Sequence, residues 1–270
     1  MTRPRLTAGV STPTSGLPAS GLLRAVCFDL DDTLVDAAGA WRAGFVEAIE
    51  PLYRATPLLR AAGSPEEVFD REFQPRAEQA YLEGGGGEWD DDYTHVAFRR
   101  LLADFVSLDG ARAERLWREY LDAWPRHLRL FPDALDTVQA AAANVPVALV
   151  SNGPSRLQRL KIERCGLGEL FDAIVISEEV GTRKPDPAIF EVALARVGAT
   201  AADAVHIGDS PAHDVAGAHR AGLGAIWVNR RRDAADAAHE HGDGPTPAAE
   251  LRPTLEVPSL SAVIGLLGLD

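Results

Sequence analysis

The sequence predicts an α/β fold: a Rossmann-like parallel-sheet core with an inserted α-helical cap domain. Two observations predict it. From residue 145 onwards, short apolar segments of strand length alternate with segments of helical periodicity, which is the rhythm of βαβ units. Between the first strand candidate, ending at Phe28, and the second, ending at Val150, residues 37–128 show helical patterning only. This stretch predicts a helical domain inserted into the core.

The same pattern divides the chain into segments. Residues 1–21 are rich in Thr, Ser, Pro and Gly and show no apolar periodicity, so we expect a disordered N-terminal extension. Residues 22–36 and 129–270 are expected to form the α/β core, and residues 37–128 the helical cap.

Four helices are predicted within the cap. Apolar residues recur at helical spacing between Trp41 and Tyr53 in the first. The run Ser64-Pro65-Glu66-Glu67 supplies an N-cap, a first-turn proline and acidic residues for the second. The third is predicted at about 93–105. The fourth spans 109–124, because Pro125 ends the pattern.

Strand and helix candidates alternate in the core. The strand candidates are short, partly β-branched apolar runs bounded by polar or turn residues, as in buried parallel strands. They end at Phe28, Val150, Ile176, Ile207 and Val228, and an edge strand is predicted at 254–257. Helix candidates lie near Leu135, from about Ser155, at 189–197, from about Asp214 and at 259–267.

Composition limits the partners. An apolar content of 46% in 270 residues is enough for an ordinary core. The net charge of −13 argues against nucleic acid as a standing partner, because phosphate backbones are held by clustered Lys and Arg. No apolar run approaches about eighteen residues, and no secretory signal is recognisable, so we expect a cytoplasmic protein without a membrane partner. The two cysteines, Cys27 and Cys165, are expected to be reduced packing thiols.

Acidic residues follow the first strand candidate directly. Asp29 and Asp31 lie two apart in extended chain, so their side chains leave the same face. Ligands of open α/β sheets bind beyond the carboxyl ends of such strands. Two carboxylates this close repel each other unless a cation neutralises them. A hard divalent ion such as Mg²⁺, which prefers oxygen ligands, is the expected cofactor.

Polar residues also follow the later strand candidates. Ser151 and Asn152 precede a helix, so the hydroxyl and nearby N–H groups are placed to hold a phosphate. Lysine occurs only at Lys161 and Lys184, and Lys184 lies in a proline-stiffened turn, which favours a phosphate role for its point charge. Asp209 ends the fourth strand, and with Asp214 it can complete a cation site.

The run Asp29-Leu30-Asp31-Asp32-Thr33-Leu34 resembles the signature loop of the haloacid dehalogenase-like hydrolase superfamily. The four loops with Asp29, Ser151, Lys184 and Asp209 occur in the order of that family's four motifs, and the insertion resembles its C1-type caps. The resemblance implies that Asp29 is the nucleophile and Asp31 the general acid and base. It also implies that the metal is bound by Asp29, the Asp31 backbone carbonyl and Asp209, with Asp214 ordering its waters. By the same resemblance, Ser151 and Lys184 balance the phosphoryl charge. Thr33 and Asn152 are implied to orient these groups.

The resemblance implies a Mg²⁺-dependent hydrolase of small phosphorylated metabolites. The family's dehalogenases lack an aspartate at the place of Asp31, and its phosphonatases need a cap lysine that this chain does not have. A sugar-phosphate mutase stays open, because it would share all of these core residues. A receiver-type phosphoacceptor domain also combines aspartates, a hydroxyl and a lysine, but it carries no acid two residues beyond its acceptor.

Further expectations concern five single residues. His206, inside the fourth strand candidate, is expected to be a packed, hydrogen-bonded histidine and not a ligand. Arg230, which follows the fifth, is expected to lie on a solvated edge. In the cap, Trp41, Arg42 and Trp89 are candidates for substrate contacts.

Overall fold

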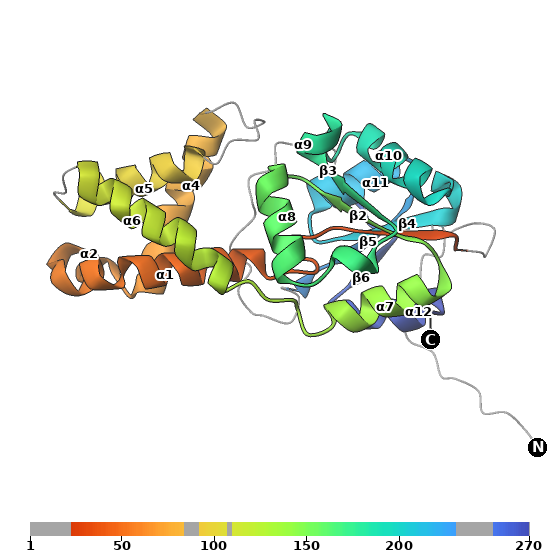
Figure 1. Ribbon diagram of the computed structural model, residues 1–270, viewed down its shortest axis with the longest axis horizontal. Helices are drawn as coiled ribbons and strands as arrows, with labels where there is room; N and C mark the ends of the chain where they lie inside the picture. Colours follow the sequence, from red (N-terminus) through yellow and green to blue (C-terminus); the bar gives the residue numbers. More distant parts are fainter. Residues whose placement is uncertain (1–22, 84–91, 107–109, 231–250, 270) are drawn as a thin grey trace, which may run out of the picture.

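The protein has two lobes, a sheet-containing core and a helical cap inserted after the first strand (Figure 1). The computed structural model describes residues 23–83, 92–106, 110–230 and 251–269. The predicted α/β fold with a Rossmann-like parallel sheet and an inserted helical cap is confirmed. The N-terminal extension, Trp89 and Asp109 lie outside the described residues. No helix in these described ranges is long and apolar enough to span a membrane.

Within the described residues the sheet has six strands, and all of its neighbouring pairs are parallel. In spatial order they are β3 (Ala173–Ile176), β2 (Val147–Ser151), β1 (Ala25–Phe28), β4 (Ala204–Gly208), β5 (Gly224–Val228) and β6 (Leu255–Val257). All six predicted strands are present. Because the strands are parallel, the polar residues that follow them meet at one edge of the sheet.

Helices cover both faces of the sheet. The core helices are α7 (Ala134–Asn144), α8 (Ser155–Arg164), α9 (Ser177–Val180), α10 (Pro187–Val197), α11 (Ala216–Arg220) and α12 (Ser261–Leu267). Residues of α7 and α12 pack in one apolar cluster with one face of the strands, and residues of α10 and α11 pack in another with the opposite face.

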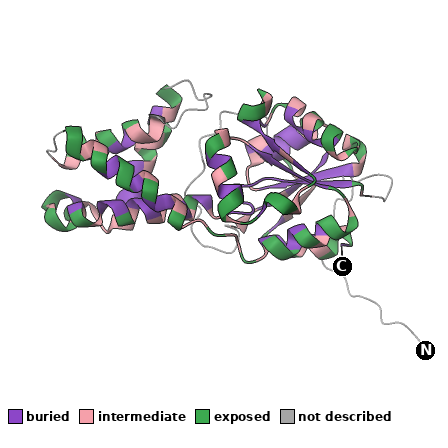
Figure 2. Ribbon diagram, in the orientation of Figure 1, coloured by how far each residue is buried: buried purple, intermediate pink, exposed green. Residues whose placement is uncertain are grey.

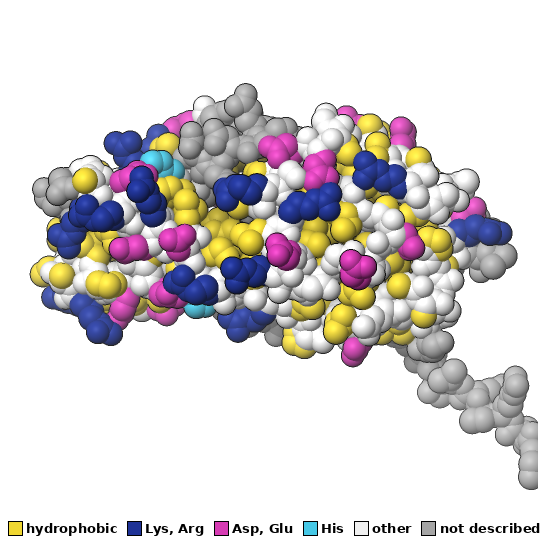
Figure 3. All heavy atoms as spheres, viewed as in Figure 1, with side chains coloured by type: hydrophobic (Ala, Val, Ile, Leu, Met, Phe, Trp, Pro, Cys, Tyr) yellow, Lys and Arg dark blue, Asp and Glu magenta, His cyan; other side chains and the backbone are white. Residues whose placement is uncertain are grey.

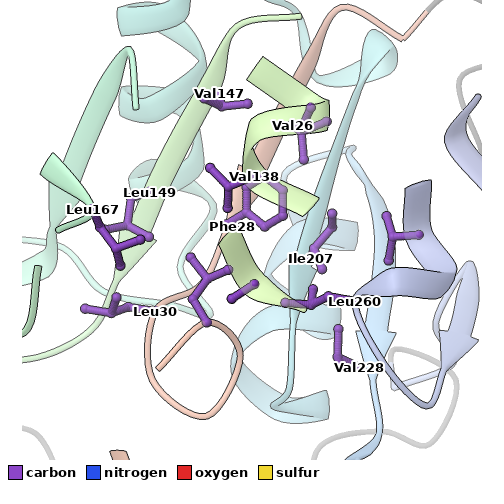
Figure 4. Packing of buried hydrophobic residues seen from close by; sticks show 14 of the residues in the cluster. Val26, Phe28, Leu30, Val138, Val147, Leu149, Leu167, Ile207, Val228 and Leu260 are labelled. Atoms are coloured by element: carbon purple, nitrogen blue, oxygen red, sulfur yellow. The ribbon is translucent and has the colours of Figure 1, made fainter. Parts of the chain in front are cut away.

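Side-chain alternation along β1 supplies both clusters. Val26 and Phe28 point into the α7 and α12 side, where larger side chains such as Leu149 fill the space (Figure 4). Ala25 and Cys27 point to the opposite side. All of them are fully buried, as the purple sheet in Figure 2 shows. Burial raises the pKa of the Cys27 thiol to about 12, which agrees with a packing role.

The cap consists of α1 (Ala37–Ala55), α2 (Pro57–Ala62), a continuous helical segment from α3 (Pro65–Val68) through a π-turn to α4 (Gln74–Glu83), α5 (Asp92–Phe105) and α6 (Gly110–Ala123). The four predicted helices are found, and the Ser64–Glu67 capping box is present. The short helix α2 was not predicted: Pro57 at its first position begins one extra turn after α1 ends.

An aromatic cluster forms the interior of the cap. Phe45 of α1 lies at its centre and contacts the rings of Phe73, Phe98 and Tyr120 at centroid distances of 4.8–6.0 Å. Leu157 of the core helix α8 belongs to the same cluster. The apolar interior of the cap therefore continues into the core, and apolar side chains are visible along the seam between the lobes in Figure 3.

Two linkers that lie side by side join the lobes. Val35 forms a bridge with Leu130, and the Asp36 N–H donates to the Arg129 carbonyl at 3.0 Å. Arg230 supports this junction. Its guanidinium donates to the Thr33 carbonyl at 2.9 Å and to the Asp133 carboxylate at 3.0 Å.

The position of Arg230 on a solvated edge was therefore predicted wrongly. Its side chain is only 21% exposed, and its guanidinium lies 3.8 Å from the centre of the Phe131 ring. The carboxylate of Asp133 also accepts the N–H of Leu260 at 2.7 Å. Because Arg230 and Asp133 bring four distant segments together, this ion pair fixes the base of the cap linkers.

We predict that Arg230→Met lowers the free energy of unfolding by about 1–3 kcal/mol at pH 7, because a charged hydrogen-bond donor to a shielded carboxylate is lost. Burial alone would raise the pKa of Asp133, but Arg230 and the Leu260 N–H together lower it. A carboxyl with a lowered pKa contributes stability above its unfolded pKa, about 4, and loses that contribution as the pH falls. Urea unfolding should therefore show a smaller deficit at low pH.

The matched control is Arg118→Met. The Arg118 side chain is largely exposed and pairs with Glu114 one helical turn away, so its removal should cost at most about 0.5 kcal/mol. A deficit for Arg230→Met no larger than that of the control, or one that does not depend on pH, would contradict the role of the pair.

Candidate active site

The register of the sheet brings the first and fourth polar loops together. Phe28 of β1 pairs with Ile207 of β4, and the Asp29 N–H donates to the Ile207 carbonyl at 2.9 Å. Asp29 and Asp209 therefore leave adjacent strand ends. Asp214 returns to the same point from the helical turn after β4. A Cβ atom on Gly208 would lie 2.2 Å from the Asp214 carboxyl carbon, so only glycine permits this approach.

Three carboxylates meet at this edge. Asp29, Asp209 and Asp214 each place an oxygen within 4.8 Å of the others. Asp29 and Asp214 are buried, and Asp209 is half-buried. A set of carboxylate oxygens at this spacing has the donor chemistry of a hard divalent cation site. The predicted ligands Asp29, Asp209 and Asp214 are thus brought together, whereas the Asp31 carboxylate is not part of this cluster.

Lys184 supplies positive charge inside the cluster. Its ammonium donates to Asp29 Oδ1 at 2.5 Å and to Asp214 Oδ1 at 2.6 Å, and the residue is buried. Burial alone would lower the pKa of Lys184, but Asp214 and Asp29 raise it above its usual value. The lysine is therefore charged at neutral pH.

The three carboxyls respond differently to the same surroundings. Burial raises the pKa of Asp29 to about 7 although Lys184 opposes the shift, and the charges of Asp214 and Asp31 add to it. Burial and the charge of Asp29 raise the pKa of Asp209 well above its usual value. Burial also acts on Asp214, but Lys184 and a hydrogen bond from His206 lower its pKa below the ordinary range. Without a further cation, the cluster holds less than its full negative charge.

His206 is a packed histidine, as predicted. It is buried, its Nε2 lies 2.8 Å from Asp214 Oδ1, and its ring meets the Phe190 ring edge-to-face. Burial lowers its pKa even though Asp214 favours the charged form, so the ring is neutral at pH 7. His206 orients Asp214 from within the sheet.

Thr33 and Asn152 connect the loops. The Thr33 hydroxyl is directed at Asp209 Oδ1 at 3.4 Å. The Asn152 side chain accepts from the Lys184 N–H at 2.8 Å and donates to the Lys184 carbonyl at 3.0 Å. Both polar atoms of this amide are thus used to hold the main chain of Lys184 beside β2. The geometry gives Asn152 an orienting position, and direct substrate contact by Asn152 stays a prediction.

Ser151 and Asp31 share a partner on α8. The Ser151 hydroxyl is buried at the end of β2 and accepts from Gln158 Nε2 at 2.7 Å. The same amide donates to Asp31 Oδ2 at 2.9 Å. Asp31, which follows β1, is therefore held next to the hydroxyl that ends the neighbouring strand.

The sequence that carries these four loops matches a known enzyme family. Residues 23–222 match the family model of haloacid dehalogenase-like hydrolases. The chain belongs to this family. The hydrolase thus carries its first loop after β1, its second after β2, its third before α10 and its fourth after β4.

Known proteins resemble the hydrolase over most of their length. It is 32% identical to the phosphoserine phosphatase of Thermus thermophilus, over 77% of this chain and 89% of that one. It is 30% identical to the N-acylneuraminate-9-phosphatase of Homo sapiens, over 77% and 83% of the two chains. The structure of the putative HAD-hydrolase YfnB from Bacillus subtilis, bound to magnesium, matches with a TM-score of 0.67 and 24% identity over 91% and 99% of the chains. This last similarity concerns the fold alone.

Sequence reasoning missed two residues of the hydrolase's site. Lys161 donates to Asp31 Oδ2 at 2.7 Å, and Gln158 joins Asp31 to Ser151. The sequence offered one indication of a role for Lys161, because it is one of only two lysines in the chain. For Gln158 the only indication was its spacing of three residues from Lys161, which puts both side chains on one face of α8.

Two of the cap residues that were candidates for substrate contacts, Trp41 and Arg42, form contacts within the cap. The Trp41 ring stacks on Trp124 at a centroid distance of 4.1 Å. Arg42 forms a two-point ion pair with Asp70, with N–O distances of 2.9 and 2.6 Å. Both residues stabilise the cap through these contacts, and neither contact identifies the substrate.

We predict that Lys184→Met lowers the free energy of unfolding by about 3–5 kcal/mol at pH 7 in the absence of divalent cations, because Asp29 and Asp214 would remain buried without a partner. Urea unfolding with a chelator present measures the loss. Arg159→Met is the matched control. It breaks an ion pair with Glu179 at the surface and should cost at most about 1 kcal/mol. Equal stability of the two variants would contradict the central role of Lys184.

Proposed function

We propose that the hydrolase cleaves small phosphate monoesters through an aspartyl-phosphate intermediate and requires Mg²⁺. The observation that carries this proposal is the cluster of Asp29, Asp209, Asp214 and Lys184, with Asp31 two residues beyond Asp29. A carboxylate next to a fixed ammonium and further acids is suited to attack on phosphorus. The phosphatases among the relatives support the same reaction class.

In the first half-reaction, an Asp29 oxygen forms a bond to phosphorus while the bond from phosphorus to the alcohol oxygen breaks. Asp31 gives its proton to the departing alcohol, which leaves neutral. In the second half-reaction, Asp31 takes a proton from water, and the resulting hydroxide attacks phosphorus. The bond between Asp29 and phosphorus breaks, which releases inorganic phosphate and restores both carboxyl groups to their initial states.

Donors at the site balance the charge of the phosphoryl group. Lys184 contributes its ammonium and Ser151 its hydroxyl, both from buried positions, where electrostatic interactions are strong. Asn152 fixes Lys184, and Thr33 orients Asp209. These groups need little reorganisation during the reaction, because their partners already hold them.

The residues present fit a magnesium ion. Asp29, Asp209 and the backbone carbonyl of Asp31 would hold it, and Asp214 would order its waters, in agreement with the oxygen-only donor set. When bound, Mg²⁺ supplies positive charge that reduces repulsion between the carboxylates and the phosphoryl oxygens.

The substrate class is supported by the relatives, whose names denote phosphomonoesters of an amino acid and a sugar acid. We propose that the substrate is a small phosphorylated metabolite. The relatives named above are phosphatases, and this favours hydrolysis over the mutase reaction.

We predict that Asp29→Asn reduces hydrolysis of p-nitrophenyl phosphate with Mg²⁺ by at least about 1,000-fold, because an amide cannot form the acyl phosphate. Release of p-nitrophenol is followed by absorbance. Asp136→Asn makes the same chemical change on the exposed surface of α7 and should retain wild-type activity. Substantial turnover by a folded Asp29→Asn protein would exclude the proposed nucleophile.

We also predict that removal of divalent metal with EDTA abolishes hydrolysis and that added Mg²⁺ restores it. Asp209→Asn should raise the Mg²⁺ concentration for half-maximal activity at least about 10-fold, because one charged ligand is lost. Mg²⁺ should also raise the melting temperature of the wild-type protein more than that of this variant, since binding stabilises the folded state. Undiminished activity in EDTA would rule out the metal requirement.

A further inference from the structure

Lys161 is a buried lysine outside the carboxylate cluster. Its ammonium lies 2.7 Å from Asp31 Oδ2, and its side chain is 7% exposed. Lysine is seldom buried to this extent unless it is paired. Asp31 provides that pair, although its own carboxylate is 29% exposed. Among the described residues, contact with Asp31 therefore offsets the cost of burying the ammonium.

Gln158 completes the attachment one turn earlier on α8. Its Nε2 donates to Asp31 Oδ2 at 2.9 Å, to Ser151 Oγ at 2.7 Å and to the Asn152 carbonyl at 2.6 Å. An amide nitrogen has two protons, so these three acceptors share them. Gln158 thereby places Asp31 Oδ2 beside the hydroxyl that ends β2.

The two oxygens of Asp31 differ in their surroundings. Oδ2 accepts from both Lys161 and Gln158. Oδ1 is buried and has no hydrogen-bond partner among the described residues. A buried carboxylate oxygen without a donor is costly unless it has a use.

We propose that Lys161 and Gln158 are positioning residues for Asp31: they hold its carboxylate by Oδ2, so that Oδ1 is the atom that exchanges the proton with the ester oxygen and later with water. This inference rests on the proposed function, in which Asp31 is the general acid and base. Fixing one oxygen sets the direction of the other, and proton transfer depends steeply on that direction.

An alternative role for the same contacts is to hold Asp31 away from the reacting atoms. The link from Gln158 to Ser151 opposes this reading, because it places Oδ2 next to a hydroxyl at the carboxyl end of the strand beside β1. α8 is also a fixed support. Leu157 is anchored in the aromatic cluster of the cap and Ile162 in the core, and Figure 1 shows the helix between the two lobes.

The test compares two esters that differ in their need for a general acid. p-Nitrophenolate leaves readily as an anion, whereas phenolate depends more on a proton from Asp31. In Lys161→Met, kcat/KM for phenyl phosphate should fall about 100-fold, the size of a typical general-acid contribution. The value for p-nitrophenyl phosphate should fall much less. kcat/KM covers only the steps up to departure of the alcohol, so the second half-reaction does not enter.

Three further variants sharpen the comparison. Gln158→Met keeps Lys161 and should change the ratio between the esters in the same direction by a smaller factor, which tests the inference even if Lys161→Met does not fold. Lys161→Arg keeps a cationic donor and should restore the ratio in part. Arg164→Met removes an exposed charge from the same helix and should leave the ratio unchanged.

Equal losses on both esters in the folded variants would overturn the inference, and so would a gain in activity, which would indicate that Lys161 restrains Asp31. Either result would leave the proposed function intact, because the wild-type protein would still hydrolyse both esters. Failure of the wild-type protein to hydrolyse either ester would overturn the proposed function and this inference with it.

Discussion

The site depends on a buried ammonium placed between carboxylates that would otherwise repel each other. Lys184 contacts Asp29 and Asp214 directly, and these two acids raise its pKa in a place where burial alone would lower it. Neighbouring residues hold Lys184 and Asp214 in place. Asn152 holds the main chain of the lysine, His206 contacts the same oxygen of Asp214 as the lysine does, and Gly208 leaves room for that carboxylate. A lysine buried at this point is stable only if several loops bring their acids to it together, so the ion pair and the parallel sheet depend on each other.

Charge on the surface differs from charge at the site. Figure 3 shows cationic and anionic side chains interspersed over the visible face, with no continuous basic surface. This agrees with the net charge of −13. Inside the protein, individual cationic side chains form ion pairs with carboxylates: Lys184 with Asp29, Lys161 with Asp31 and Arg230 with Asp133.

Much of the fold could be predicted because its signals are local. Each strand is a short apolar run that ends in a polar residue, and the parallel arrangement alone brings Asp29 and Asp209 to adjacent strand ends. The features that were missed depend on distant contacts. Arg230 looks like one of a run of surface arginines until the cap linkers bring Thr33 and Asp133 to it. Lys161 looks like an ordinary helical residue until the loop after β1 is placed, because the face of α8 that meets Asp31 is set by tertiary packing.

Adjacent residues of the helix α8 contact different lobes, so this helix connects the cap with the residues around Asp31. Leu157 packs into the aromatic interior of the cap, whereas Gln158, the next residue, binds Asp31 and Ser151. Successive residues of a helix point in directions about 100° apart, so a single rigid turn contacts both lobes. The cap is covalently attached only through the paired linkers at Val35 and Leu130, and Val35 follows Asp31 by four residues and forms a bridge with it. The linkers and α8 therefore hold Asp31 from two sides. The position of the cap and the direction of the Asp31 carboxylate thus depend on the same few contacts. Among the residues of the site, the Asp31 carboxylate is therefore the one most sensitive to how the two lobes meet.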